Sequence, residues 1–259
     1  MTRIIAIANQ KGGVGKTTTA INLSAALALL GHEVLIVDMD PQANATASLG
    51  LRGRPGRSTY EFVLGGARLT DVVVPTGSER VWIVPATSDL AGADVELAQL
   101  SDRTSRLKAA LAGAVAPFRF VIIDCPPSVS LLTLNALAAA QEVIVPVQCE
   151  YLALEGLGEF TKTLELVRRN LNRDLRLRGL LLTMYDRRTN LSRQVADEVR
   201  RHFPNTFHAV IPRSVRLSEA PSHGLPINAY DDRSPAAIAY QELAEELLAA
   251  IGSTVEVAS

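Results

Sequence analysis

The stretch from Asn9 to Thr19 carries residue types that bind phosphate, and it reads Asn-Gln-Lys-Gly-Gly-Val-Gly-Lys-Thr-Thr-Thr. Its glycines, Gly12, Gly13 and Gly15, allow the backbone to curve with its N–H groups pointing inward. An apolar, β-rich stretch precedes this loop, and apolar residues at helical spacing follow it, so the loop joins a strand to a helix. The N-terminus of that helix adds partial positive charge beneath a bound anion. The pattern predicts a nucleotide phosphate site.

Two side chains of this loop have definite expected partners. We expect Lys16 to contact the β- and γ-phosphates and the Thr17 hydroxyl to bind Mg2+, so the expected cofactors are ATP and Mg2+. The candidate nucleotide-binding residues of the loop are Lys11, Gly12, Gly13, Val14, Gly15, Lys16, Thr17 and Thr18.

Acidic residues follow two apolar, strand-like stretches. The first stretch, 33–39, leads into Asp38-Met39-Asp40-Pro41-Gln42, and the second, 118–127, contains Val-Ile-Ile followed by Asp124 and then by two prolines. Because the carboxyl ends of parallel strands meet beside such a loop, we expect Asp38 and Asp40 to lie near Mg2+ and the γ-phosphate. Asp124 has the position of a Walker B acid, which accepts a hydrogen bond from a Mg2+-bound water.

The elements that must position these residues alternate along the chain. Strand-like stretches are 3–8, 33–39, 80–85, 118–127, 142–148, 175–184 and 208–211; helical stretches are 19–30, 59–64, 131–140, a long one ending near 171, 191–202 and 234–251, with one or two helices in 94–116. This alternation predicts an α/β fold with a mostly parallel, twisted sheet covered by helices on both faces. We found no linker within the 259 residues, so we expect a single P-loop ATPase domain over 1–259.

Composition excludes some classes of protein. No stretch approaches the roughly 20 continuous apolar residues that cross a membrane, and the first strand begins too early for a signal peptide. Cys125 and Cys149 lie in apolar contexts without metal-ligand spacing, which favours buried free thiols in a reducing cytosol. We therefore expect a cytoplasmic protein.

Charge is distributed unevenly. The formal net charge is −1, yet residues 162–216 contain thirteen Lys/Arg and five Asp/Glu, and twelve of the thirteen are arginines. A field of one sign is what binding to a phosphate backbone requires, although any single arginine can equally be a solvated helix residue.

The loop departs from the usual spacing Gly-x-x-x-x-Gly-Lys-Thr, because Gln10 stands where the first glycine is required and a second lysine, Lys11, follows it. This variant resembles the deviant P-loop of the ParA/MinD superfamily of dimerising ATPases. The resemblance implies that Lys11 reaches across a two-fold interface to the phosphates bound by the partner subunit, so that the ATP-bound protein is a homodimer. The catalytic candidates are then Lys11, Lys16 and Asp40.

The same resemblance implies roles for residues elsewhere in the site. Asp38 would hold a Mg2+-bound water, and Asp40 would position or activate the attacking water. Met184 would lie beside the adenine, and Pro212 and Arg213 would close over the base. The candidate metal-site residues are Thr17, Asp38 and Asp124.

Similarity to the Soj/ParA branch covers essentially the whole chain. It implies a weak ATPase whose ATP-bound dimer binds nonspecific double-stranded DNA on the nucleoid. A ParB-type centromere-binding partner would stimulate hydrolysis during chromosome or plasmid segregation. The regions associated with DNA contact contain Arg187, Arg188, Arg193, Arg213 and Arg216.

Three alternatives belong to related classes. A MinD-like membrane-bound regulator is disfavoured because residues 234–251 include Glu242, Glu245 and Glu246 but no Lys or Arg, and an acidic helix is repelled by anionic lipids. A metal-cluster reductase like the nitrogenase iron protein fits the positions of Cys125 and Cys149 poorly. A relative that positions another cargo stays open.

Overall fold

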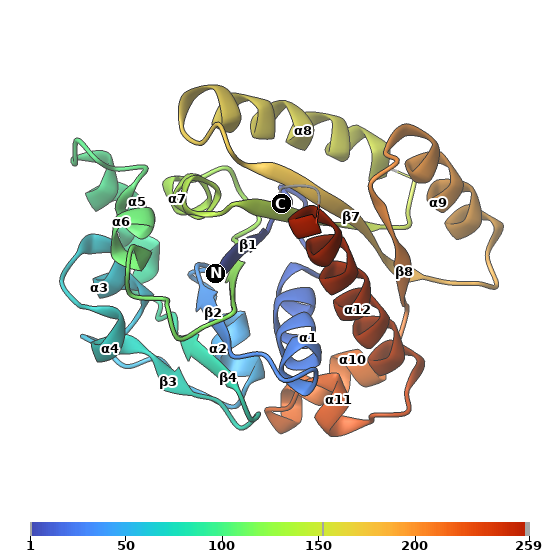
Figure 1. Ribbon diagram of the computed structural model, residues 1–259, viewed down its shortest axis with the longest axis horizontal. Coiled ribbons are helices and arrows are strands. Elements are labelled where there is room, and N and C mark those ends of the chain that lie inside the picture. Colours follow the sequence, from blue (N-terminus) through green and yellow to red (C-terminus); the bar gives the residue numbers. More distant parts are fainter. Residues whose placement is uncertain (1, 152, 257–259) are drawn as a thin grey trace.

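The computed structural model describes residues 2–151 and 153–256, and one eight-stranded sheet forms its centre (Figure 1). Seven strands are parallel and one short edge strand, β3 (Val74–Pro75), is antiparallel to its neighbour. From that edge the order continues β4 (Val81–Val84), β2 (Val34–Asp38), β5 (Phe120–Asp124), β1 (Arg3–Ile7), β6 (Glu142–Gln148), β7 (Arg176–Tyr185) and β8 (Thr206–Pro212).

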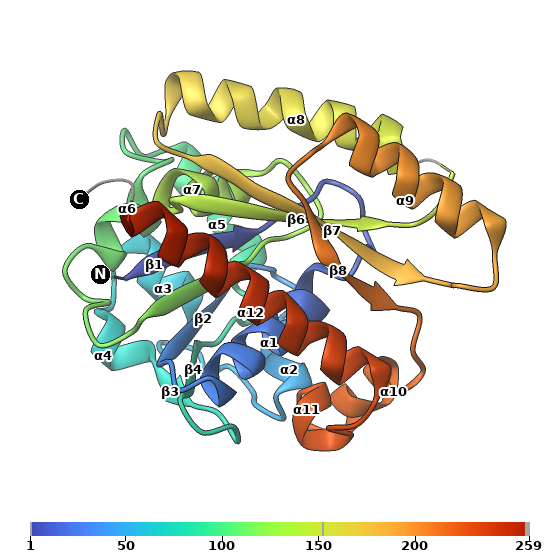
Figure 2. The same cartoon turned by 45° about the vertical axis from the view of Figure 1, so that its right-hand side comes forward.

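Helices cover both faces of this sheet (Figures 1 and 2). One face carries α1 (Lys16–Leu29), α2 (Asn44–Ser48), α10 (Arg216–Glu219), the 3-10 helix η1 (Ala220–His223), α11 (Ile227–Tyr230) and α12 (Pro235–Glu256). The other carries α3 (Thr59–Leu64), α4 (Leu69–Val72), α5 (Leu90–Ala98), α6 (Arg106–Leu111), α7 (Leu131–Ala139), α8 (Ala153–Asn170) and α9 (Asn190–His202). The predicted α/β fold with a mostly parallel, doubly covered sheet is confirmed.

The core consists of two layers because side chains alternate between the faces of a strand. In β1, Ile5 and Ile7 point toward α1 and α12, whereas Ala6 points toward the helices of the other face. Both faces of the central strands are therefore apolar, and polar residues are confined to the strand ends. This arrangement brings the residues that follow β1, β2 and β5 to one edge of the sheet.

Helix α12 packs along α1 and β8 in both ribbon views (Figures 1 and 2). Tyr240, Leu243 and Leu247 are buried in the layer formed with α1. Glu246 accepts hydrogen bonds from the backbone N–H groups of His208 and Ala209 at 2.9 and 3.1 Å. Within the described residues, no helix is long and apolar enough to span a bilayer.

Candidate nucleotide-binding site

The phosphate loop connects β1 to α1 and ends at Gly15, which has φ 89° and ψ 26°. This left-handed conformation is readily adopted only by glycine, and it turns the chain directly into the helix. Helix α1 begins at Lys16, three residues before the start that the sequence pattern predicted. The phosphate loop therefore includes the first turn of the helix. The backbone N–H groups of that turn lack intrahelical partners and can bind an anion.

Side chains hold this loop in place from three neighbouring elements. The Asn9 amide donates to a β6 carbonyl oxygen at 2.7 Å, the Gln10 amide donates to Thr163 Oγ1 on α8 at 2.8 Å, and Thr183 Oγ1 on β7 donates to the Val14 carbonyl at 2.9 Å. Gln10, which replaces the usual first glycine, thus fastens the loop to α8. Sequence reasoning did not assign roles to Thr163 or Thr183.

The two lysines differ in environment. The Lys16 side chain is buried, and its Nζ donates to the Lys11 carbonyl at 3.0 Å. Burial lowers the pKa of Lys16, and the opposing attraction to Asp124 is the next largest influence on it. Lys11 is half-buried, and its backbone N–H donates to Asn9 Oδ1.

Asp38 and Asp124 are register partners at the carboxyl ends of β2 and β5. Both Asp124 carboxylate oxygens are buried without a hydrogen-bond partner among the described residues. Burial first, and the charge of Asp38 second, raise the pKa of Asp124 well above its usual range; Thr17 and Lys16 act in the opposite direction. A buried carboxylate with free oxygens beside a threonine hydroxyl is a donor set that Mg2+ prefers, so these residues fit the ion.

The carboxylate of Asp38 already has protein partners. Its Oδ2 accepts hydrogen bonds from the backbone N–H and the Oγ1 of Thr46 at 2.9 and 2.7 Å, and its Oδ1 accepts from the Asp40 N–H at 3.2 Å. Burial nevertheless raises its pKa to about 6. Asp40 is buried as well, and its Oδ1 accepts a hydrogen bond from the Gln42 N–H at 2.9 Å. The sequence pattern did not assign a role to Thr46, which lies in α2 six residues after Asp40.

A cavity of about 290 Å³ opens directly beside the phosphate loop. Gly15 and Thr18 line it together with the three residues expected around the base, Met184, Pro212 and Arg213. Met184 has φ 51°, an uncommon conformation for a residue with a side chain. The structure therefore brings the separate sequence segments 15–18, 183–184 and 211–218 to one cavity.

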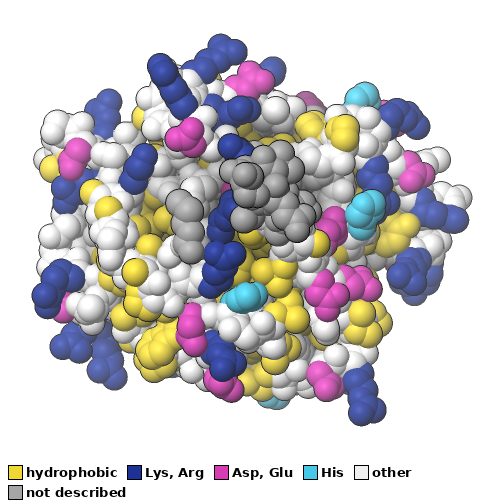
Figure 3. All heavy atoms as spheres, viewed as in Figure 1, with side chains coloured by type: hydrophobic (Ala, Val, Ile, Leu, Met, Phe, Trp, Pro, Cys, Tyr) yellow, Lys and Arg dark blue, Asp and Glu magenta, His cyan; other side chains and the backbone are white. Residues whose placement is uncertain are grey.

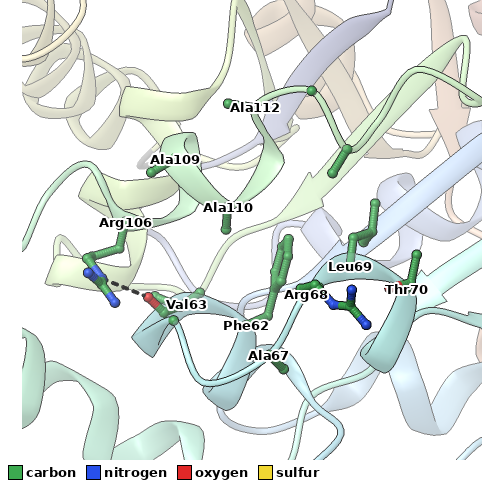
Figure 4. Close-up of a pocket in the computed structure, with 13 residues that line it drawn as sticks. Phe62, Val63, Ala67, Arg68, Leu69, Thr70, Arg106, Ala109, Ala110 and Ala112 are labelled. Atoms are coloured by element: carbon green, nitrogen blue, oxygen red, sulfur yellow. Dashed lines mark hydrogen bonds between the residues drawn. The ribbon is translucent and has the colours of Figure 1, made fainter.

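A larger cavity, about 690 Å³, lies elsewhere, between α3, α4 and α6 (Figure 4). Arg106 at its wall donates to the Val63 carbonyl at 3.2 Å and pairs with Asp102 at 3.0 Å. The guanidinium thus caps the end of α3. No residue of the phosphate loop lines this cavity.

The five DNA-contact candidates lie on loops and helix starts after β7 and β8, on the carboxyl edge of the sheet. Arg187 and Arg213 are exposed and make no ion pair within the described part of the chain. Arg188 pairs with Asp186 at 2.8 Å, and Arg193 donates to Asn190 at 2.6 Å.

Arg216 has acidic partners that the sequence did not reveal. Its guanidinium lies 3.1 Å from Glu219 and 3.5 Å from Asp231, and it sits over the Tyr230 ring with 5.9 Å to the centroid. The side chain is 56% exposed. Arg216 therefore faces outward as expected, but with its charge matched by two carboxylates.

The basic segment 162–216 does not form one surface. Arg178 is largely buried at the amino end of β7, where it pairs with the buried Glu142. The end of α8 carries further arginines, and Figure 3 shows Lys and Arg side chains projecting from the margin over α8 and α9. The local charge excess is thus shared between the two edges of the sheet and a structural ion pair.

Both cysteines are buried free thiols. Burial, followed by the charge of Asp124, raises the pKa of Cys125, and burial raises the pKa of Cys149 to about 12. These environments favour unreactive thiols.

A parallel sheet with a phosphate loop after its first strand, and acids after two neighbouring strands, defines a P-loop nucleotide-binding protein. A family model described as an AAA domain (AAA_31) matches residues 2–177. The sporulation initiation inhibitor protein Soj of Bacillus subtilis is 51% identical over 96% of this chain and 99% of its own length. The chromosome-partitioning ATPase Soj of Thermus thermophilus is 53% identical over 96% of each chain. The chain belongs to the ParA/Soj family of partitioning ATPases.

Solved structures share the fold of this chain. A protein from Mycobacterium smegmatis, described as cobyrinic acid a,c-diamide synthase with bound ADP and magnesium, is 42% identical over 96% of this chain and 94% of its own, with a TM-score of 0.82. The cell division ATPase MinD of Pyrococcus furiosus is 28% identical over 95% of this chain and 98% of its own, with a TM-score of 0.80.

Proposed function

We propose that this chain is a nucleotide-gated partitioning switch, which binds nonspecific double-stranded DNA as an ATP-bound homodimer and leaves it after hydrolysis. The observation that carries this proposal is the shared edge of the sheet: Arg213 lines the cavity beside the phosphate loop, and the exposed Arg187 lies on the neighbouring loop. Nucleotide occupancy and DNA contact would therefore involve the same segments.

The hydrolysis chemistry follows from the residues present. Lys16 would bind the β- and γ-phosphates, and the first-turn N–H groups of α1 would stabilise their charge. Thr17, Asp38 and Asp124 would hold Mg2+, and the bound ion would supply positive charge beside the phosphates. Asp40 would orient the attacking water. Positioning and charge stabilisation without a strong base suggest slow unaided turnover, roughly 10^-4 to 10^-3 per second as in other P-loop switches.

The proposal of a homodimer depends on Lys11. Its half-buried side chain makes no ion pair within the described residues, which supports a role in the partner's site, where it would contact phosphate across a two-fold axis. ATP would then bridge two protomers, and loss of the γ-phosphate would weaken the dimer because a ligand stabilises the state that it binds best. Two protomers would double the arginine contacts to DNA and raise affinity steeply.

A ParB-type partner would complete the cycle by stimulating hydrolysis, and the protein would be cytoplasmic and associated with the nucleoid. The curated relatives named for chromosome partitioning support this assignment. The acidic residues of α12 and the burial of its apolar face in the core support DNA rather than lipid as the platform.

The deciding experiment measures binding to two duplexes of unrelated sequence at fixed low salt, without nucleotide, with ADP and with a slowly hydrolysed ATP analogue. We expect binding only with the analogue, equal for both duplexes and falling steeply with salt. The Lys16→Ala variant, which should bind no nucleotide, is the control. Wild-type protein that binds neither duplex in any nucleotide state would contradict the proposed function and direct attention to a membrane or protein platform.

A further inference from the structure

The short helix α2 is attached to the nucleotide site at one end. Thr46 in α2 donates two hydrogen bonds to Asp38, and its Oγ1 accepts a third from the Ala86 N–H at 2.9 Å. The residue before α2, Ala43, has φ 53°, so the connection from Asp40 to α2 is a strained, tightly defined turn. The position of α2 therefore depends on the arrangement of the two acids.

At its other end α2 leads into a close backbone crossing. Gly50 and Gly224 have φ 71° and 70°, and a Cβ built on Gly224 would lie 2.9 Å from Gly50 Cα and 3.1 Å from Gly50 N. A Cβ on Gly50 would lie 3.3 Å from Gly224 Cα. Because no side chain separates the two backbones, a displacement of one cannot be absorbed by a rotamer change at the contact.

Gly224 directly follows the segment that carries Arg216. Helix α10 runs without interruption into η1, which ends one residue before Gly224. The same segment contributes Leu217 and Ser218 to the cavity beside the phosphate loop. It also contains Arg216, whose guanidinium pairs with Glu219 on its own helix and with Asp231 beyond α11.

We propose that Gly50 and Gly224 are positioning residues that transmit the position of α2 at the phosphate end of the site to α10 and Arg216. Movement of α2 would shift η1 and α10 relative to α11, which would separate Arg216 from Asp231 and make its charge available to DNA. This inference rests on the proposed function for the role of DNA. The linkage itself concerns the nucleotide site and residues 216–224.

A graded set of alanine variants tests the contact. Gly224→Ala introduces the closest clash, Gly50→Ala a milder one, and Gly113→Ala is the matched control, because Gly113 has φ 73° and no atom within 4 Å of the added Cβ. All three carry the same backbone strain. We expect ATP-analogue affinity within about threefold of wild type in each, because none of the three glycines lines the cavity beside the phosphate loop. DNA affinity with the analogue should fall at least about tenfold in Gly224→Ala, less in Gly50→Ala, and stay unchanged in Gly113→Ala.

Hydrogen exchange gives a second measurement that needs no DNA. Adding the ATP analogue to wild type and to Gly113→Ala should change amide protection in residues 216–224, and this response should be lost in Gly224→Ala. A wild-type protein without a response in 216–224, or a Gly224→Ala variant that keeps both the response and wild-type DNA affinity, would overturn the linkage. If wild type binds no DNA, the proposed function fails while the exchange response still decides this inference. Should Gly224→Ala not fold, Gly50→Ala provides the same comparison.

Discussion

Asp38 and Asp124 occupy paired positions on neighbouring strands, yet their side chains have different partners. Asp38 accepts three hydrogen bonds from the segment after β2, whereas both oxygens of Asp124 have none within the described residues. The sequence predicted acids at this edge from strand-end positions alone. It could not distinguish their roles, because Thr46 reaches Asp38 only after α2 has folded back over the strand end.

The first prediction concerns the pH dependence of stability without Mg2+. Burial raises the pKa of Asp124 well above its usual range and that of Asp38 to about 6. The folded protein therefore retains protons that the unfolded chain releases near pH 4, so these groups lower the free energy of unfolding as pH rises from about 4 through 6 and beyond. The Asp124→Asn substitution removes this loss of free energy of unfolding at one of the two carboxyl groups.

We expect the thermal stability of Asp124→Asn relative to wild type to increase with pH, by at least about 1.4 kcal/mol between pH 4.5 and 7.5, the equivalent of one pKa unit. Thermal unfolding in chelator across this range measures the difference. A difference that stays constant or shrinks as pH rises would show that Asp124 is not held in a charge-disfavouring environment.

Arg216 supports a second prediction at the level of residues. Asp231→Asn removes one of its two acidic partners, while Asp232→Asn makes the same charge change at a position without an ion pair among the described residues. Exposed ion pairs contribute less than about 1 kcal/mol. DNA affinity with an ATP analogue should therefore rise about twofold to fivefold more in Asp231→Asn than in Asp232→Asn; equal effects would mean that Asp231 does not restrain Arg216.

At the level of elements, long periodic stretches were predictable and short ones were not. Strand β6 and helix α3 have the predicted bounds, and two helices overlap the predicted 94–116 region, although α5 begins four residues earlier, at Leu90. The sequence did not indicate α2, α4, α10 or α11, because helices of four or five residues show no apolar period. Their positions depend on long-range contacts, such as the Ile227 N–H that donates to Asn22 on α1 at 2.7 Å.

Helix α2 gives the third prediction. Thr46→Val keeps the shape of the side chain but removes the hydroxyl bond to Asp38 and leaves the buried Ala86 N–H without its acceptor. The lost bonds should lower the free energy of unfolding by about 1–3 kcal/mol. Because α2 positions Asp38 and Asp40, hydrolysis should fall more than ATP affinity.

Thr206→Val is the control, since Thr206 Oγ1 also donates one hydrogen bond, in this case to the Phe203 backbone carbonyl at 2.7 Å, but on the opposite edge of the sheet. Thermal unfolding, nucleotide affinity and phosphate release are measured on both variants. Loss of stability in both with unchanged hydrolysis in Thr46→Val would mean that α2 is merely structural.

At the level of the whole molecule, the distribution of charge along the sequence predicted only part of the basic surface. The direction of the strands places Arg187, Arg213 and Arg216 on the nucleotide edge of the sheet and Arg178 near the opposite edge. Because a β-strand rises about 3.3 Å per residue, arginines that are ten residues apart in the sequence lie at opposite ends of β7. A count along the sequence cannot detect this separation, because it depends on the direction of each strand.

The fourth prediction concerns assembly. Lys11→Ala should retain nucleotide binding, because Lys16 and the loop N–H groups are intact, but should lose the dimer formed with an ATP analogue. Analytical ultracentrifugation of wild type, Lys11→Ala and the exposed control Lys108→Ala with the analogue measures the molecular mass. A Lys11→Ala protein that dimerises as wild type would exclude Lys11 from the partner's site.

The chain contains a single tryptophan, Trp82, and it lies away from the nucleotide site. Trp82 is the second residue of β4, and its Nε1 donates to Glu33, the residue before β2, at 3.3 Å. It therefore lies near the amino edge of the sheet, opposite the phosphate loop. Intrinsic fluorescence excited at the indole should follow global denaturation yet stay constant during ATP titration, which makes Trp82 a built-in optical reference for every variant described above.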